Sequence, residues 1–357
     1  MDDFWPAGVP DADAILRDLQ DAGILATAAQ LVPLSGGVSC EVWKVAAADL
    51  SEQVRHANPH GLVIKAPLAT LRTPSLWQVD TSRGFAESEA LRWYAGLTPA
   101  SVPRVVWQHP SAPVMAVEAA PQSWQEWRTQ MLDADFQSSA VGGERLEGIC
   151  RSLGTTLAAW HEGTRDVEAL PEVLRTGDRL RTLRTDVFHR ATAEQVPEIA
   201  PELEALAVEL ETAQTCLVHG DFSPKNVLVS PPGDSLAAWM LDAEVAHVGD
   251  PALDVAYLST HLACKAVARP LMSVRLDRAR LAFEDAYRSG SALVGDDRLS
   301  RHTGAILAAR MRGVSRVTYL DADQQSFVLE RAVRLVQGRS SLDETWAEIL
   351  KRTAPAG

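Results

Sequence analysis

The most specific pattern in the chain is Leu217-Val-His-Gly-Asp-Phe-Ser-Pro-Lys-Asn-Val-Leu-Val229, followed after a short turn by Trp239-Met-Leu-Asp-Ala-Glu244. Asp221 and Asn226 share one loop, and Asp242 ends the next apolar run. Such an arrangement supplies an acid–base group and two oxygen ligands for Mg²⁺. The stretch therefore predicts the chemistry of phosphoryl transfer.

Three short, β-prone runs surround these side chains. The runs cover residues 216–218, 227–229 and 237–241. Pro231-Pro-Gly-Asp-Ser235 between the last two predicts a hairpin connection. We therefore expect Asp221, Asn226 and Asp242 to lie at neighbouring strand ends.

The motif His219-Gly-Asp-x-x-x-x-Asn226 has the spacing of the protein-kinase catalytic loop, with Gly220 where that loop has arginine. Each piece alone is common in turns and caps. With Asp242 and Gly249-Asp-Pro-x-x-Asp254 in the correct order, the set resembles the aminoglycoside phosphotransferase and choline kinase superfamily. Members of that superfamily phosphorylate hydroxyl groups of small molecules on a protein-kinase-like fold.

The resemblance implies an α+β, bilobal protein-kinase-like fold. Residues 1–118 would form a nucleotide-binding lobe with an antiparallel sheet and a helix, and residues 119–357 a mainly helical lobe with the catalytic loop and acceptor site. Sequence patterns predict strands within residues 34–45, 61–67, 102–107 and 113–121. They predict helices over residues 11–22, 85–94, 123–132, 144–161, 276–288, 299–319, 324–336 and 342–351, another starting at 251, and an irregular helical insertion over 171–214.

Two elements of the first lobe are expected to hold the donor nucleotide. The turn Ser35-Gly36-Gly37 allows backbone to approach phosphates, although a plain hairpin turn is the alternative. Lys65 ends an apolar strand, as does the lysine that holds the α and β phosphates in kinases. By the resemblance, Glu87 pairs with this lysine, with Glu89 as the alternative.

The exit from the last strand of this lobe is the expected contact for adenine. The resemblance assigns that contact to the backbone of Val117, Glu118 and Ala119, whereas an ordinary edge strand is the alternative.

The second lobe carries the expected catalytic residues. Asp221 accepts or orients the acceptor's hydroxyl proton, and Asn226 and Asp242 bind Mg²⁺ through oxygen. Asp242-Ala-Glu244 resembles choline kinases and methylthioribose kinases, which makes Glu244 a further candidate metal ligand. Lys225 is either a solvated loop lysine or a group that neutralises the transferred phosphoryl.

Three nearby polar residues are expected to be structural. His219 should brace the catalytic loop through hydrogen bonds, and Asp254 should steady the loop from the first turn of a helix. His161, at the end of a long helix, should be a cap or a packed core residue.

Composition bounds the remaining possibilities. The chain has 357 residues, 46% hydrophobic and 23% charged, which suits a globular protein with a full core. No apolar run approaches the ~20 residues of a membrane span, so no membrane partner and a cytoplasmic location are expected. A net charge of −13 opposes nucleic-acid binding. The cysteines, Cys40, Cys150, Cys216 and Cys264, have no zinc-site spacing and should be core thiols.

The predicted activity is the ATP-dependent phosphorylation of a small-molecule hydroxyl. Trp124, Trp127 and the acidic residues between 168 and 211 are candidates to offer a ring face and carboxylates to a sugar, amino sugar, choline-like alcohol or aminoglycoside. A catalytically silent nucleotide-binding module of the same fold is the alternative. A protein kinase is disfavoured because the arginine of His-Arg-Asp, Asp-Phe-Gly and Ala-Pro-Glu are missing.

Overall fold

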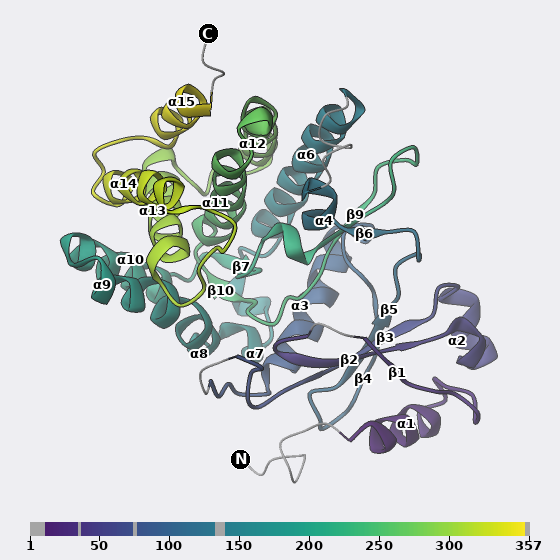
Figure 1. Cartoon of the computed structure of the whole chain (residues 1–357). Coiled ribbons are helices and arrows are strands. Elements are labelled where there is room, and N and C mark those ends of the chain that lie inside the picture. Colours follow the sequence, from purple (N-terminus) through teal and green to yellow (C-terminus); the bar gives the residue numbers. More distant parts are fainter. Residues whose placement is uncertain (1–10, 35–36, 74–76, 133–139, 354–357) are drawn as a thin grey trace. The chain divides into compact units, whose positions relative to one another are not determined.

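The computed structural model describes residues 11–34, 37–73, 77–132 and 140–353 (Figure 1). By its internal contacts the chain divides into two compact units. Unit 1 contains Met1–Trp124 and Leu241–Glu244, and unit 2 contains Gln125–Met240 and Val245–Gly357. Asp242 and Glu244 therefore pack with the N-terminal part of the chain, although their neighbours in sequence belong to unit 2.

Unit 1 is built on an antiparallel sheet with the strand order β1-β2-β3-β5-β4. The strands are β1 (Val32–Pro33), β2 (Cys40–Val45), β3 (Leu62–Pro67), β4 (Val105–Gln108) and β5 (Met115–Glu118). The helices are α1 (Ala12–Asp21), α2 (Glu52–Ala57) and α3 (Arg83–Leu97). The strands predicted within 61–67, 102–107 and 113–121 are confirmed, as are the second of the two runs within 34–45 and the helices at 11–22 and 85–94. The first strand, β1, precedes the predicted run, and α2 was not predicted.

Alternation along the strands gives the sheet two different faces. One face carries Trp43 and Ile64, which pack with Ile15 and Leu19 of α1 in the core of the unit. Lys65 follows Ile64 and so projects to the opposite face, where it meets α3. The period of the strand therefore places the lysine outside the apolar core.

Unit 2 is mainly helical. Its longer helices are α6 (Ala140–Gly163), α10 (Ala200–Thr212), α11 (Ala252–Ala268), α12 (Ser273–Gly290), α13 (Asp296–Arg312), α14 (Ala322–Val336) and α15 (Leu342–Thr353). The shorter ones are α4 (Trp127–Leu132), α7 (Glu172–Arg175), α8 (Asp178–Leu180), α9 (Ala191–Gln195) and the π-helix η3 (Arg181–Arg190). The α+β class, with a sheet-bearing first part and a mainly helical second part, is confirmed.

Two small antiparallel sheets frame the catalytic loop. β7 (Cys216–Val218) pairs with β10 (His247–Gly249), and β8 (Val227–Val229) lies between β6 (Gln125–Glu126) and β9 (Ala238–Met240). The predicted hairpin between β8 and β9 is confirmed, and β10 was not predicted.

Two helix predictions need correction. The helix expected over 123–132 begins at Trp127, because Gln125 and Glu126 pair with β8. The helix expected over 299–319 ends at Arg312, where Gly313 follows and Val317 N–H turns back to Arg310 O.

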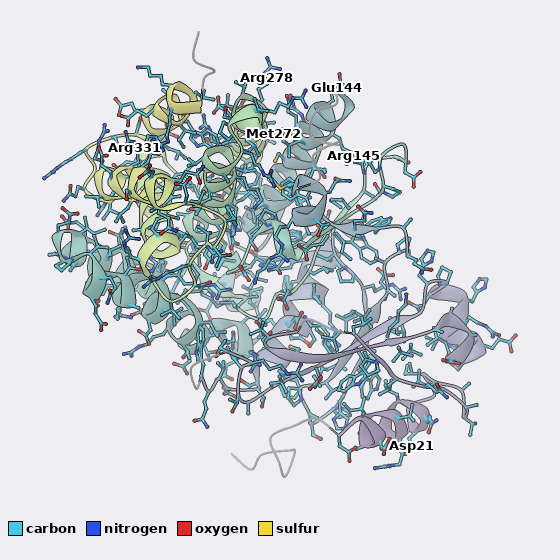
Figure 2. The ribbon with its side chains drawn as sticks, viewed as in Figure 1. Asp21, Glu144, Arg145, Met272, Arg278 and Arg331 are labelled. Carbon is cyan, nitrogen blue, oxygen red and sulfur yellow. The ribbon has the colours of Figure 1, made fainter. Side chains whose placement is uncertain are left out.

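The helices α6 and α12 pack closely, side by side and parallel. A side chain at Gly154 of α6 would lie 2.2 Å from the carbonyl oxygen of Phe283, so the two backbones touch there. In Figure 2, Glu144 and Arg278 lie at the same end of the two helices. His161 near the end of α6 contacts Tyr287 of α12 and is fully buried, which confirms it as a core residue.

The four cysteines are buried free thiols, as predicted. No helix in the described part of the chain combines the length and apolar character that crossing a membrane requires.

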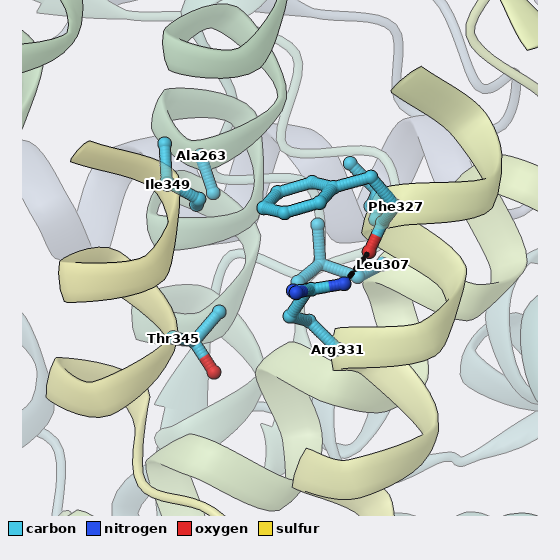
Figure 3. Close-up of a pocket in the computed structure, with 7 residues that line it drawn as sticks. Ala263, Leu307, Phe327, Arg331, Thr345 and Ile349 are labelled. Atoms are coloured by element: carbon cyan, nitrogen blue, oxygen red, sulfur yellow. Dashed lines mark hydrogen bonds between the residues drawn. The ribbon is translucent and has the colours of Figure 1, made fainter. Parts of the chain in front are cut away.

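A small apolar cavity of about 10 Å³, room for roughly one water, lies among the C-terminal helices of unit 2 (Figure 3). Its lining residues are Ala263, Leu307, Phe327, Val328, Arg331, Thr345 and Ile349. The Arg331 guanidinium lies 3.8 Å from the centre of the Phe327 ring. Thr345 is buried, and its hydroxyl finds no hydrogen-bond partner among the described residues.

We expect Thr345→Val to raise the free energy of unfolding by about 1 kcal/mol, because valine keeps the shape and removes an unsatisfied buried hydroxyl. Urea denaturation of the parent and the variant measures the change. Thr318→Val, at an exposed position, is the matched control and should leave the midpoint unchanged. A lower midpoint for Thr345→Val than for the parent would show that the hydroxyl is bonded in solution.

Candidate active site

The catalytic loop joins β7 to β8 and is hydrogen-bonded to Asp254, which lies in the first turn of α11. The fully buried carboxylate of Asp254 accepts hydrogen bonds from His219 N–H at 2.6 Å and Gly220 N–H at 2.8 Å. It also lies 3.3 Å from Nε2 of His161. The expectation that Asp254 steadies the loop is confirmed by these contacts.

The loop is also braced from within. Asp221 N–H donates to Nδ1 of His219 at 3.2 Å, and Nδ2 of Asn226 donates to Asp221 O at 3.0 Å. Gly220 has φ +77°, and a Cβ there would lie 2.8 Å from Val245 O. The chain therefore excludes an arginine at the position where protein kinases carry one, and the predicted brace by His219 is present.

The Asp221 side chain is buried between two cations. Its carboxylate lies 2.9 Å from Nζ of Lys225 and 3.2 Å from Arg184. Burial alone would raise the pKa of Asp221, but Lys225 and Arg184 outweigh it and hold the pKa well below its usual range. Asp221 is thus ionised at any ordinary pH. Lys225 has a specific partner and is not simply solvated.

Arg184 is a residue that the sequence did not single out. It lies on the π-helix η3, donates from Nε to Gly220 O at 2.6 Å, and places its guanidinium 5.5 Å from the centre of the Tyr257 ring. π-Helical segments are rare and often occur at functional sites. A lone arginine in a charged, irregular segment carries no local signal, so only the tertiary structure reveals it.

Unit 1 contains a second charged cluster, centred on Lys65. Its Nζ lies 2.5 Å from Glu87 and 2.8 Å from Asp242. Glu89, the alternative to Glu87, bonds Arg92 instead at 2.5 Å. Burial lowers the pKa of Lys65, but Asp242 and Glu87 outweigh it and raise the pKa well above its usual value. Lys65 is therefore a fixed cation that bridges the two carboxylates.

Asp242 has a backbone conformation that few residues other than glycine adopt. Its φ is +66°, the only positive φ of a non-glycine residue in the described part of the chain. Aspartate tolerates this conformation better than most residues, and strained backbone clusters at functional sites. In this conformation the carboxylate lies 2.8 Å from Nζ of Lys65.

Glu244 is held by Arg83, a second residue that the sequence analysis missed. The side chain of Arg83 is fully buried, and its Nε donates to Glu244 at 3.1 Å. Its Nη2 donates to the carbonyl oxygens of Ser39 at 2.6 Å and Leu68 at 2.7 Å, and its Nη1 donates to Asp80 O at 3.0 Å. Burial, with Asp242, raises the pKa of Glu244. Arg83 therefore joins the segment after β9 to the loops that flank β2 and β3.

The glycine turn is described only in part. Ser35 and Gly36 lie outside the described residues, so their expected phosphate contact stays a prediction. A Cβ at Gly37 would lie 2.4 Å from Cys40 O, so the backbone there is too close for any side chain. This geometry requires glycine at the hairpin itself.

The expected adenine contact falls on an interior strand. β5 lies between β3 and β4, so the alternative of an edge strand is wrong. Val117 pairs with both neighbouring strands, Glu118 N–H donates to Arg104 O, and Ala119 N–H donates to Gly61 O, both at 3.0 Å. The adenine contact stays a prediction for the carbonyl oxygens of this exit.

Trp127 and several of the acidic residues expected to recognise the acceptor are engaged elsewhere. Trp127 is 1% exposed and belongs to the core, and Trp124 is half-buried. Within the insertion, Arg190 contacts Asp186 at 2.9 Å, Glu204 at 2.9 Å and Glu211 at 2.6 Å. Glu168 lies 2.8 Å from Arg175. These carboxylates are paired with arginines of their own segment.

Asn226 and Asp242 fit a magnesium ion by their chemistry. Both offer oxygen, and Mg²⁺ takes one or two protein ligands together with phosphates and water. The Asp242 side chain is 28% exposed, and Asn226 uses its amide nitrogen toward Asp221, which leaves the amide oxygen for another partner. Among the described residues no group of three or more His, Cys, Asp or Glu side chains is arranged to hold a metal by itself.

The described part of the chain has a protein-kinase-like α+β fold. A solved microcompartment-associated aminopropanol kinase matches with a TM-score of 0.51 and 15% identity, covering 96% of this chain and 100% of that one. An amicoumacin kinase in complex with AMP-PNP, Ca²⁺ and Ami matches with a TM-score of 0.53 and 11% identity, covering 93% and 95%. At these identities the likeness shows the fold.

The family follows from the sequence itself. The family model described as the phosphotransferase enzyme family matches residues 30–293, so this chain belongs to that family. The match confirms the resemblance to aminoglycoside phosphotransferases and choline kinases. A search of curated proteins finds no match to this sequence.

Proposed function

We propose that the chain transfers the γ-phosphate of ATP to a hydroxyl group of a compact small molecule, with Mg²⁺ as cofactor. The family membership supports phosphotransfer. The observation that carries the proposal is the ion cluster in which Lys65 bridges Glu87 and Asp242. Kinases use these residue types to hold donor phosphates and metal, and a purely structural ion pair does not need Asp242 in a strained conformation.

Each residue has a geometric role, because phosphoryl transfer asks the protein for position and charge neutralisation. Lys65, fixed by Glu87, binds the donor phosphates. Asp242 and Asn226 hold Mg²⁺, with Glu244 as a further candidate ligand, and the ion neutralises phosphate charge when bound. The hydroxyl oxygen forms a bond to the γ-phosphorus, the bond from that phosphorus to the bridging oxygen breaks, and ADP leaves.

Asp221 receives the hydroxyl proton, and the low pKa of its carboxylate determines when in the reaction the proton is transferred. A carboxylate whose pKa is held far below the usual range is a weak base, so it orients the hydroxyl and takes the proton late in the transfer. Lys225, 2.9 Å away, is positioned to neutralise the transferred phosphoryl group as charge moves onto it. Because the carboxylate is ionised, the reaction does not depend on its titration.

The acceptor proposed from the motifs is a sugar, amino sugar, amino alcohol or aminoglycoside. The segment from Asp242 to Gly249 is short and offers no platform for an extended peptide. Nucleotide binding is assigned to the N-terminal lobe and acceptor binding to the helical lobe. A cytoplasmic location, where ATP and Mg²⁺ are abundant, completes the proposal.

An ADP-release assay against a panel of sugars, amino alcohols and aminoglycosides tests this function. We expect ADP release that depends on both Mg²⁺ and an acceptor, with label from [γ-³²P]ATP in a small-molecule product. Tight ATP binding with no transfer to any small molecule, from the panel or from a metabolite extract, would favour the silent nucleotide-binding module. Label that appears only in protein would point to a protein kinase.

Lys65→Met is expected to raise the KM for ATP by about tenfold or more, because one charge-assisted contact to the phosphates is lost. The KM for the acceptor should stay within about twofold. Steady-state kinetics with each substrate varied in turn measures both. Lys351→Met, on the exposed face of α15, serves as the control and should change neither. Unchanged ATP affinity with weakened acceptor binding would remove Lys65 from the donor site.

A further inference from the structure

One face of α11 carries three polar side chains at intervals of four residues. Tyr257, His261 and Lys265 lie one above the other, because residues four apart share a face of a helix. The face begins beside the catalytic loop, since the guanidinium of Arg184 lies 5.5 Å from the centre of the Tyr257 ring and 3.2 Å from Asp221. It extends about 12 Å along the helix to Lys265. We call these three side chains the α11 face.

The groups around the α11 face are mostly cationic. At its start, Arg184 and Lys225 flank Asp221. At its far end, Lys265 is 5% exposed, and its Nζ lies 5.8 Å from the centre of the Tyr319 ring. The charges of Arg128 and Arg310 disfavour the charged form of Lys265, and the charge of Glu126 favours it.

The nearby acidic group is already paired. Glu126 accepts two hydrogen bonds from Arg128, at 2.6 and 3.3 Å. Arg310 donates to Ser315, to the carbonyl oxygen at 2.7 Å and the hydroxyl at 2.8 Å. In the part of the chain that the structure describes, neither Lys265 nor Arg310 has a carboxylate within 4 Å. The far end of the α11 face is therefore a cationic region without a matching anion.

The pKa values along the face agree with this charge balance. Burial lowers the pKa of Lys265 to about 8, and Arg128 and Arg310 act in the same direction. Burial also lowers the pKa of His261, with Lys265 and Arg310 adding to the effect. An uncompensated buried cation is costly, and a bound anion would relieve that cost.

The Tyr257 hydroxyl supplies a second and independent sign of a ligand. Tyr257 is 3% exposed, and its hydroxyl has no hydrogen-bond partner among the described residues. A buried polar group without a partner is uncommon in a folded protein. At this position, next to Arg184 and the catalytic loop, a polar group of the acceptor would satisfy it.

We propose that the acceptor carries an anionic group, a carboxylate or a phosphate, in addition to the hydroxyl that receives the phosphoryl group. Lys265 and Arg310 bind the anion, and Tyr257 bonds a polar group near the reacting hydroxyl. This inference rests on the proposed function and narrows its acceptor. Lys225 and Arg184 touch Asp221 and serve the reaction itself, whereas Lys265 lies two helical turns beyond Tyr257 and serves recognition.

Binding experiments test the proposal without requiring turnover. Four probes are titrated calorimetrically into the full chain with ADP and Mg²⁺ present: gluconate, glucose 6-phosphate, glucose and choline. Glucose 6-phosphate and glucose differ only in the phosphate, and gluconate tests a carboxylate on an open-chain polyol. We expect at least one of the two anionic probes to bind about tenfold or more tightly than glucose and choline, the gain of one charge-assisted contact.

Lys265→Met should reduce the affinity for the anionic probe by about tenfold and leave that for glucose unchanged. The exposed Lys351→Met is the matched control and should bind all four probes as the parent does. Tyr257→Phe removes only the unsatisfied hydroxyl, so it should weaken the anionic probe without lowering the melting temperature. If Lys265→Met is not folded at the assay temperature, two other measurements test the proposal. They are the affinity of Tyr257→Phe for the anionic probe and the order of affinities of the parent protein for the four probes.

The inference is overturned if glucose or choline binds as tightly as both anionic probes, or if a folded Lys265→Met keeps the parent's affinity for the anion. Failure of this inference and failure of the proposed kinase activity give different experimental results. Phosphorylation of a neutral or cationic acceptor, independent of Lys265, leaves the kinase in place and removes the anion site. Anion binding that depends on Lys265, with no phosphoryl transfer to any acceptor, does the reverse.

Discussion

Asp221→Asn is expected to lower kcat by about 10³-fold, because asparagine can neither take the hydroxyl proton nor orient the hydroxyl as a carboxylate does. The KM for ATP should stay within about threefold, since Asp221 serves the acceptor side of the reaction. The fold should persist, because the amide occupies the same space and Arg184 keeps its hydrogen bonds to Gly220 O and Leu183 O. Circular dichroism and the melting temperature check the fold, and initial rates of ADP release measure kcat.

The matched control for this variant is Asp234→Asn, at an exposed position in the β8–β9 hairpin. It makes the same chemical change outside the loop and should keep the parent's rate. A folded Asp221→Asn variant with the parent's kcat would falsify the assignment of Asp221. Loss of activity in both variants would instead point to a general effect of the charge change.

Asp242→Asn is expected to lower kcat by about 10²- to 10³-fold at a fixed, low Mg²⁺ concentration. The neutral amide binds Mg²⁺ more weakly than the carboxylate does, so the concentration of Mg²⁺ at half-maximal rate should rise. Part of the lost rate should return at high Mg²⁺. In Asp221→Asn, by contrast, Mg²⁺ should restore nothing, because that residue is not a ligand.

Asp242 contacts Lys65 and has a positive φ, and both features affect the result expected for Asp242→Asn. The substitution also weakens the contact with Lys65 at 2.8 Å, so the KM for ATP should rise as well, by less than the fall in kcat. Asparagine tolerates positive φ as aspartate does, so the backbone at φ +66° need not move. Asp21→Asn on α1 is the exposed control in the same unit. An unchanged Mg²⁺ requirement in Asp242→Asn would assign the metal to other residues.

The sequence was sufficient where the determining interactions are local. Gly220, Asp221 and Asn226 lie within one short loop, and the hydrogen bonds that shape it join residues two and five positions apart. The strand period placed Lys65 on the face opposite the apolar core, because alternate side chains must point to opposite faces. The cap of α1 was equally local, since Asp11 accepts from the N–H groups of Asp13 and Ala14.

The sequence was less reliable where a neighbour distant in the chain decides the local structure. The sequence around Gln125 and Glu126 predicts a helix. The two residues form a strand instead, because they pair with β8. The exit strand β5 was open to an interpretation as an edge strand, and only the pairing with both β3 and β4 excluded it. Such pairings carry little signal in the short segments that make them.

The family, the catalytic loop and the residue types that phosphoryl transfer needs could be predicted from the sequence, because they depend on spacing within short segments. Which charged side chains meet follows from the folded chain alone. Arg83 reaches Glu244 across 161 positions, Lys65 reaches Asp242 across 177, and Arg184 reaches Asp221 from within the irregular insertion. An arginine or lysine looks the same in sequence whether solvated or buried. Its pairing and its pKa follow from desolvation and from charges brought near by folding, which no local pattern encodes.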